Sequence, residues 1–393
     1  MLERRVNAIL FVALLSTSMG QTLVFSILPS LARELDLAEV QMGAVITASS
    51  IIFAYASPLW GNVSDRLGRK PVMMIGLFGY CFGTLLFASM FVMGRMGIMQ
   101  GTVLFAGLIA TRMIQSIVMS ATNPSVTAYV ADITNVSNRT SGMARLGAAQ
   151  NLGTILGPAV GGGLAVWGLL MPMWFAAMAT FVAGIIAWRV LPVPKIQAHF
   201  KRGERLSYFD HRVVSYIVIA VAMFTAFAIV QQTLGYRLQD LLGLTPQEGA
   251  HSLAICLMSG AVCSLAAQVI CVQGSKWPPE RLLKVGGPVL LIGLILLLCA
   301  DRLTLFVAAV SLVGFGTGLM SPGFSSLASL AVESHEQGGV AGLLGAAPGL
   351  GFIIGPILGT ALYQVEPHLP YAVTVLIIIP LVPYIWTRTH RVS

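Results

Sequence analysis

The chain has 393 residues, of which 56% are hydrophobic and only 10% are charged. Soluble domains carry roughly 25% charged residues, so this composition excludes a water-soluble globular protein. The formal net charge of +8 is spread over short segments between apolar runs, which favours orientation in a membrane over nucleic-acid binding. The apolar runs are too long for the strands of a membrane barrel and suit membrane-spanning helices.

Twelve such runs, separated by clusters of glycine, proline and charge, predict an all-α membrane protein with twelve transmembrane helices. Their approximate limits are 6–28, 41–60, 71–93, 101–122, 143–166, 168–190, 212–235, 247–271, 282–300, 303–325, 338–363 and 368–387. The first run has no small-residue cleavage site, so we expect an uncleaved helix and not a signal peptide. The five cysteines lie in or beside apolar runs without metal-ligand spacing, which indicates small hydrophobic residues.

The positions of lysine and arginine predict the orientation of the chain. Seventeen of the 23 lie in segments that would be cytoplasmic if both termini are cytoplasmic, and four lie in outer loops, namely Arg33, Arg95, Arg237 and Arg302. This bias predicts cytoplasmic termini. The polar stretch 191–211 would link two six-helix bundles, 1–190 and 212–393, and its basic residues suit contact with anionic lipid.

The first motif, between spans two and three, is GNVSDRLGRKP from Gly61 to Pro71. It closely resembles the cytoplasmic-loop signature of the major facilitator superfamily, G-x-x-x-D-R-x-G-R-[KR]. Glycines at Gly61 and Gly68 would allow a close helix approach and a sharp turn. The resemblance implies that this loop latches the outward-open state. The acid of the loop would cap a helix of the opposite half near Gly338, and an arginine of the loop would pair with a second acid, at the end of span four. The latch residues would be Asp65, Arg66, Arg69 and Asp132; the alternative is an ordinary positively charged loop.

Span four contains Arg112 and Gln115, followed by Asn123-Pro124 and an AYVAD ending. It resembles the superfamily's signature for this span, although Ser116 stands where glycine is usual. Arg112 lies near mid-membrane, where an unpaired cation costs roughly 2.5–3.5 kcal/mol on insertion scales. We therefore expect it to face a wet cavity and bind a negative group. The structural alternative is bonding to carbonyls of a neighbouring helix.

A sixteen-residue segment occurs twice, as GAAQNLGTILGPAVGG from Gly147 and as GAAPGLGFIIGPILGT from Gly345. Duplicated halves around a central site are the plan of many secondary transporters. In span five the segment resembles the G-x(8)-G-P-x-x-G-G signature of the superfamily's antiporter branch, which implies export. Its small residues would let helices touch and slide, with packing alone as the alternative. The gating candidates are Gly153, Gly157, Pro158, Gly161, Gly355 and Pro356.

All fifteen carboxylates fall in loops or at predicted helix ends, so none is expected at mid-membrane. Exporters of lipophilic cations in the family commonly carry an acid in span one, whose polar residues here are neutral. A neutral or positive pocket favours an anionic or zwitterionic substrate. Arg112 is the expected anion partner, and the neutral binding candidates are Gln115, Gln21, Asn123, Gln231 and Gln232. Gln231 and Gln232 have a solvated alternative at the outer end of span seven.

His251 and Arg145 are the candidates for proton coupling. A histidine gains and loses a proton near neutral pH, and His251 is predicted in the outer third of span eight. Its alternative role is that of a hydrogen-bonded interface residue. Arg145 has the alternative of pairing with Asp65 or Asp132.

The resemblance covers essentially the whole chain and implies a monomeric exporter in a bacterial inner membrane, working by alternating access and proton exchange. Our preferred substrate is an anionic or zwitterionic amphiphile such as a siderophore or metallophore. The alternatives are a multidrug/proton antiporter for cationic or neutral drugs and a non-transporting receptor. No Ser/His/Asp, metal or nucleotide-binding arrangement occurs, so we expect neither an enzyme nor a cofactor, and no nucleic-acid partner.

Overall fold

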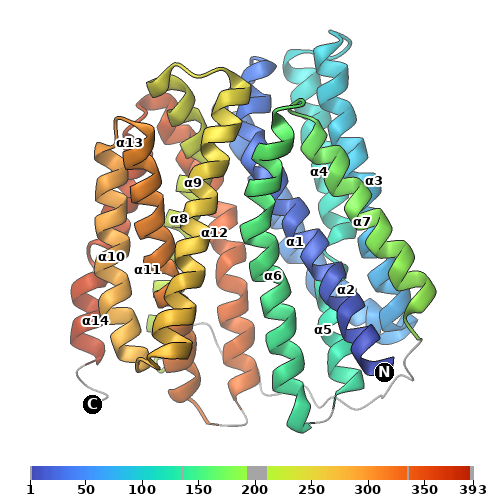
Figure 1. Cartoon of the computed structure of the whole chain (residues 1–393), viewed down its shortest axis with the longest axis vertical. Helices are drawn as coiled ribbons and strands as arrows, with labels where there is room; N and C mark the ends of the chain where they lie inside the picture. The colour runs from blue at the N-terminus through green and yellow to red at the C-terminus, as the bar shows by residue number, and fades with distance from the viewer. Residues whose placement is uncertain (1, 135, 193–209, 334–335, 390–393) are drawn as a thin grey trace. The chain divides into compact units, whose positions relative to one another are not determined.

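The computed structural model describes residues 2–134, 136–192, 210–333 and 336–389, and these residues are almost entirely helical (Figure 1). Most of the predicted linker lies outside the described residues. Contacts group the chain into two compact units, Met1–His199 with Pro246–Ala254, and Phe200–Thr245 with Ile255–Ser393. The first turns of α9 thus join the first unit, whereas the sequence places the division near 191–211. Those predicted bundle boundaries stay a prediction.

The first unit is built mainly from α1 (Leu2–Glu34), α2 (Glu39–Leu67), α3 (Arg69–Arg95), α4 (Gly101–Met119), α5 (Thr122–Ile133), α6 (Val136–Ala165) and α7 (Met171–Val190). The second contains α8 (Val214–Leu242), most of α9 (Pro246–Ala267), the π-helix η1 (Gln268–Gly274), α10 (Pro279–Cys299), α11 (Leu303–Leu330), α12 (Gln337–Val365), α13 (Leu369–Ile378) and α14 (Leu381–Thr389).

Eleven helical stretches of the described chain are long and apolar enough to cross a membrane. Three of them join two consecutive segments each: α4 with α5, α9 with η1, and α13 with α14. Pro124 lies in the first turn of α5, where a missing N–H is tolerated, and Pro380 separates α13 from α14. The predicted fifth span, within α6, is not among the eleven, because its glycines and polar residues lower its hydropathy.

Each unit has one helix pair held together by the duplicated glycines. In the first unit α6 packs on α1, and a Cβ added at Gly157 would lie 2.0 Å from Thr22 Oγ1. In the second unit α12 packs on α8, and a Cβ at Gly355 would lie 2.6 Å from the Ala228 Cβ. One turn to either side, an added Cβ would again lie no more than 3.2 Å from the partner helix, at Gly153, Gly161, Gly351 and Gly359. The close packing expected of the repeat is therefore present twice, whereas its role in gating stays a prediction.

Candidate functional site

Arg112 of α4 is fully buried within the first unit. Its Nη1 donates a hydrogen bond to Gln115 Oε1 at 2.6 Å, and Gln115 Nε2 donates to Thr84 Oγ1 on α3 at 2.7 Å. Thr84 Oγ1 in turn donates to the Tyr80 carbonyl at 2.8 Å. Two predicted binding residues thus lie together, and α3 fixes the orientation of Gln115.

The rest of the Arg112 guanidinium is surrounded by aromatic rings. Its Cζ lies 5.3 Å from the ring centroid of Phe87 and 5.7 Å from that of Phe25. Neither Nε nor Nη2 has a hydrogen-bond acceptor in the described part of the chain. The carbonyl-bonded alternative for this arginine is therefore wrong. A buried donor without a partner costs about 1–3 kcal/mol, and more when it is charged, so the structure holds an unsatisfied cation here. The expected binding of a negative group by Arg112 stays a prediction.

Glycines on α3 explain why these side chains meet. A Cβ added at Gly83 would lie 2.6 Å from Gln115 Cγ, and one at Gly76 would lie 2.3 Å from Thr122 Oγ1. These two glycines are seven residues apart and lie on one face of the helix. Their spacing is the signal that sequence reasoning missed, and with it Thr84 and Tyr80 as neighbours of the arginine.

A cavity of about 90 Å³ lies in the first unit beside this cluster. Gln21 and Asn123 line it, as do Tyr80 and the hydroxyls of Thr17 and Ser18. Asn123 Oδ1 also accepts a hydrogen bond of 3.0 Å from Gln150 Nε2, and Gln150 lines the same cavity. Arg112 and Gln115 do not line the cavity, but Tyr80 does, and its carbonyl accepts from the Thr84 hydroxyl that holds Gln115. The predicted polar residues therefore form two adjoining layers, a neutral one at the cavity and a charged one behind it.

The second unit has a larger cavity of about 340 Å³ between α8, α11 and α12. Its lining is also uncharged: Phe224, Phe324 and other apolar groups face three serines, Ser321, Ser325 and Ser329, spaced four residues apart on α11. Neither cavity is lined by a carboxylate.

Gln231 and Gln232 do not line either cavity, but they are buried, with exposures of 5% and 2%. The solvated alternative is therefore wrong. Their helix, α8, extends to Leu242, beyond the predicted end of span seven, and this places both glutamines well inside it. Gln231 Oε1 and Gln232 Nε2 have no hydrogen-bond partner among the described residues, so each could bind a ligand, although no contact assigns them to one.

Arg237 corrects the predicted charge map. The sequence placed it in an outer loop, but it lies in α8 and is 2% exposed. Its guanidinium donates to the carbonyls of Leu298 at 3.2 Å and Pro367 at 3.1 Å. Hydropathy could not reveal this, because the carbonyls that accept from Arg237 come from other segments, the last turn of α10 and the connection between α12 and α13. At the carboxyl end of a helix the dipole favours a cation.

The cytoplasmic-loop motif has the geometry of an ion-pair cluster. Arg69 Nε lies 2.9 Å from Asp132 Oδ2, its Nη1 donates to Ser64 Oγ at 2.8 Å, and it also pairs with Asp65. Gly68 has a φ of +97°, which supplies the expected sharp turn. The expected pairing of an arginine with the acid ending span four is present, and it ties the start of α3 to the end of α5.

Three other expectations for this loop fare differently. The close helix approach at Gly61 is wrong, because a Cβ there would lie 4.0 Å from its nearest neighbour, an ordinary contact. Arg66 is exposed. The helix near Gly338 that Asp65 would cap belongs to the second unit, so the cap stays a prediction.

Neither proton-coupling candidate has an ion-pair partner in the described residues. Arg145 of α6 is exposed, and its alternative pairing with Asp65 or Asp132 is wrong, because both acids pair with Arg69 among the described residues. His251 is exposed in the early part of α9. The coupling role of both residues stays a prediction.

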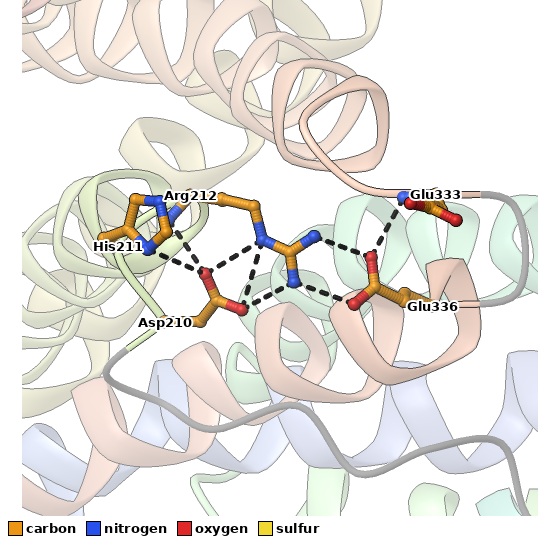
Figure 2. A network of polar contacts seen from close by, with 5 residues as sticks. All are labelled: Asp210, His211, Arg212, Glu333 and Glu336. Carbon is orange, nitrogen blue, oxygen red and sulfur yellow. Dashed lines mark hydrogen bonds and ion pairs between the residues drawn. The ribbon is translucent and has the colours of Figure 1, made fainter.

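The second unit has a different ion-pair cluster, which the sequence did not single out (Figure 2). Arg212, just before α8, lies 2.8 Å from Asp210 and binds both carboxylate oxygens of Glu336 at 2.7 and 2.8 Å. These hydrogen bonds lower the pKa of Asp210 to about 2 and raise the pKa of Arg212. Glu336 is the N-cap of α12, so the cluster ties together the starts of the two helices that share the glycine contact.

Comparisons with known proteins agree with this architecture. The model of the Major Facilitator Superfamily matches residues 10–300 and 264–392. The chain is 27% identical to Multidrug resistance protein 1 of Bacillus subtilis, over 92% of this chain and 90% of that protein. It is 23% identical to Quinolone resistance protein NorA of Staphylococcus aureus, over 90% and 88% of the two chains.

Solved structures show the same fold at low sequence identity. The nucleoside transporter NupG has a TM-score of 0.77 at 12% identity, covering 98% of this chain and 99% of its own. The human organic anion transporter MFSD10 (TETRAN) has a TM-score of 0.66 at 20% identity, with the same coverage. These likenesses confirm the predicted twelve-helix fold, which counts α6 as a span in addition to the eleven described above.

Proposed function

The chain belongs to the major facilitator superfamily and is a multi-pass membrane transporter of a small molecule. We propose that it exports amphiphilic drugs. The observation that carries the proposal is the similarity to a multidrug resistance protein over nine-tenths of both chains. Export would run from the cytoplasm across a bacterial inner membrane, in exchange for protons and with the monomer as the working unit.

The cavities support a drug-like substrate better than our preferred siderophore or metallophore. The relatives are named for resistance to multiple drugs and to quinolones, and none of those reported above is named for a metal chelator. Both cavities combine aromatic or aliphatic side chains with neutral hydroxyl and amide groups. Such a lining selects ligands by apolar contact with a few hydrogen bonds, which suits varied amphiphiles. We therefore adopt the multidrug alternative.

Within that class, Arg112 favours substrates that carry a carboxylate or another strong acceptor. Its Nε and Nη2 have no acceptor among the described residues, and no carboxylate lines the adjoining cavity. Arg112 is fully buried behind the cavity in this conformation, so the proposal requires that the transport cycle expose it. A substrate carboxylate would then accept both N–H groups at once, the geometry in which arginine binds most strongly. A permanent cation would gain nothing comparable here. We thus keep the sequence-based preference for anionic or zwitterionic molecules and apply it to drugs.

The glycine contacts and the charged loop would serve the conformational cycle. Helices that meet through glycine backbones can slide without displacing side chains, so α6 on α1 and α12 on α8 are the proposed moving contacts. The Arg69–Asp132 pair would keep α3 and α5 together during the movement, and Asp65 would form the latch.

Transport into everted membrane vesicles tests the proposal. We expect uptake of a fluoroquinolone, which carries a carboxylate, to depend on an imposed proton gradient and to exceed uptake of the permanent cation ethidium. Asp65→Asn should slow turnover yet leave drug binding near normal. If a catecholate chelator were taken up and neither drug were, the siderophore hypothesis would return. Absence of gradient-dependent uptake of all three compounds would contradict export.

A further inference from the structure

Two cations at the start of α10 have no acidic partner in the part of the chain that the structure describes. Arg281 and Lys284 are three residues apart, so they lie on the same side of the helix. Neither forms an ion pair within the described residues, and Glu280 beside them forms none either. The predicted orientation places this end of α10 at the cytoplasmic surface of the membrane. The pair therefore presents unneutralised positive charge where lipid headgroups lie.

Each cation is held over a tryptophan from a different segment. The Arg281 Cζ lies 4.2 Å from the ring centroid of Trp277, which precedes α10, and Lys284 Nζ lies 5.9 Å from the ring of Trp386 in α14. Trp386 is 48% exposed. Contact with a ring face uses no N–H group, so the hydrogen-bond donors of both cations remain for an anion. Tryptophan is also the residue typical of the headgroup layer.

An exposed apolar stripe continues from the two cations along the same face of α10. Ile292 and Ile295 follow at helical spacing and are 56% and 44% exposed. In the adjoining α13, Leu376 is 67% exposed. α14 packs on α10 next to the cations, where a Cβ at Gly287 would lie 3.5 Å from Ile385 Cδ1. Cations, tryptophans and apolar stripe thus follow the order of headgroup, interface and acyl chain in a lipid leaflet.

We propose that this corner of α10 and α14 binds an anionic phospholipid of the cytoplasmic leaflet. Arg281 and Lys284 donate to its phosphate, Trp277 and Trp386 flank the headgroup, and an acyl chain lies along the stripe at Ile292. Inorganic phosphate would use the cations alone, whereas a phospholipid uses all three features. A zwitterionic lipid brings its own cation and gains less from the pair.

Lipid binding can be measured without any transport assay. The purified full-length protein would be placed in nanodiscs of phosphatidylcholine, with or without phosphatidylglycerol, and examined by thermal unfolding and by native mass spectrometry. Phosphatidylglycerol should raise the melting temperature and remain bound to the wild-type protein. Arg281→Gln with Lys284→Gln should weaken its binding about fivefold for each cation removed, as expected from ~1 kcal/mol per charge near the surface.

Two controls make the outcome decisive. Arg302→Gln removes an exposed cation beyond the other end of α10 and should leave phosphatidylglycerol binding unchanged. Arg281→Lys with Lys284→Arg keeps both charges and should retain the lipid even if the neutral variant folds poorly. Equal lipid binding by the neutral variant and the wild type would overturn the proposal. So would loss of lipid from the charge-preserving variant, or full stabilisation by inorganic phosphate alone. None of these results depends on what the protein exports.

Discussion

Two buried arginines, Arg112 in the first unit and Arg237 in the second, differ in the hydrogen-bond acceptors around them. Both are at most 2% exposed, and both guanidinium groups lie near two aromatic rings. Arg237 donates to two main-chain carbonyls and contacts His368 Nδ1 at 3.0 Å. Arg112 has one acceptor, a side chain of its own helix, and two nitrogens without any.

This difference is why we propose a binding role for Arg112 and a structural one for Arg237. The carbonyls of Leu298 and Pro367 accept from both terminal nitrogens of Arg237, so only its Nε lacks a partner in the described chain, and removing the side chain would leave both carbonyls without their donor. Arg112 is retained although most of its donors are unsatisfied, a cost that stability alone does not explain. A neutral side chain at that position would make the fold more stable. Binding of a ligand is therefore the explanation that we propose for the charge.

The largest expected effect is on folding. Arg237→Ala removes a buried charged donor that joins α8 to the end of α10 and to the connection between α12 and α13. Each hydrogen bond to a charged group contributes about 1.5–3 kcal/mol, so we expect a loss of roughly 3 kcal/mol or more in unfolding free energy. Denaturation of the purified protein in detergent measures it. Arg302→Ala, at a side chain that is 72% exposed, is the control and should change little. If Arg237→Ala were as stable as the wild type, the structural role of Arg237 would be contradicted.

The second effect is on binding. Arg112→Gln should weaken binding of a carboxylate drug at least tenfold while the melting temperature stays the same or rises, because an unsatisfied buried charge is removed. Calorimetric titration and thermal unfolding measure the two quantities separately. A fall in stability similar to that of Arg237→Ala would return Arg112 to a structural role.

A smaller effect should follow from releasing Gln115. Thr84→Val keeps the side-chain shape but removes the acceptor of the Gln115 amide, worth about 1 kcal/mol, so drug affinity should fall several-fold. Thr180→Val is the matched control, since that buried hydroxyl bonds only to carbonyls of its own helix. Equal affinities of both variants would show that Gln115 does not position Arg112.

The smallest effect concerns Arg212, the paired arginine near the surface. Because its hydrogen bonds lower the folded pKa of Asp210 from 3.8 to about 2, the carboxylate stabilises the fold fully above pH 4. That contribution should fade as the pH falls from 4 towards 2. The melting temperatures of wild type and Asp210→Asn, compared from pH 7 to 3, should therefore differ by a constant amount until pH 4 and converge below it. A difference that changes between pH 7 and 5 would contradict this assignment.

Much of the site could be predicted from local sequence, but not the side chains that surround Arg112. Arg112 with Gln115, and Arg69 with Asp132, were found because an ion inside an apolar run or a motif is conspicuous. Phe25, Tyr80 and Thr84 were missed because such residues are ordinary in membrane helices and gain their meaning only from what lies opposite. Arg237 was misplaced because its helix continues through a polar stretch stabilised by distant carbonyls.

The sequence by itself determined the class of protein, the membrane spans and the duplicated glycine segments, because hydropathy and small-residue spacing act within one helix. Only the tertiary structure decided which buried arginine has acceptors for both terminal nitrogens and which has an acceptor for one. That depends on acceptors supplied by other helices, and no spacing along a single chain segment records where those helices end.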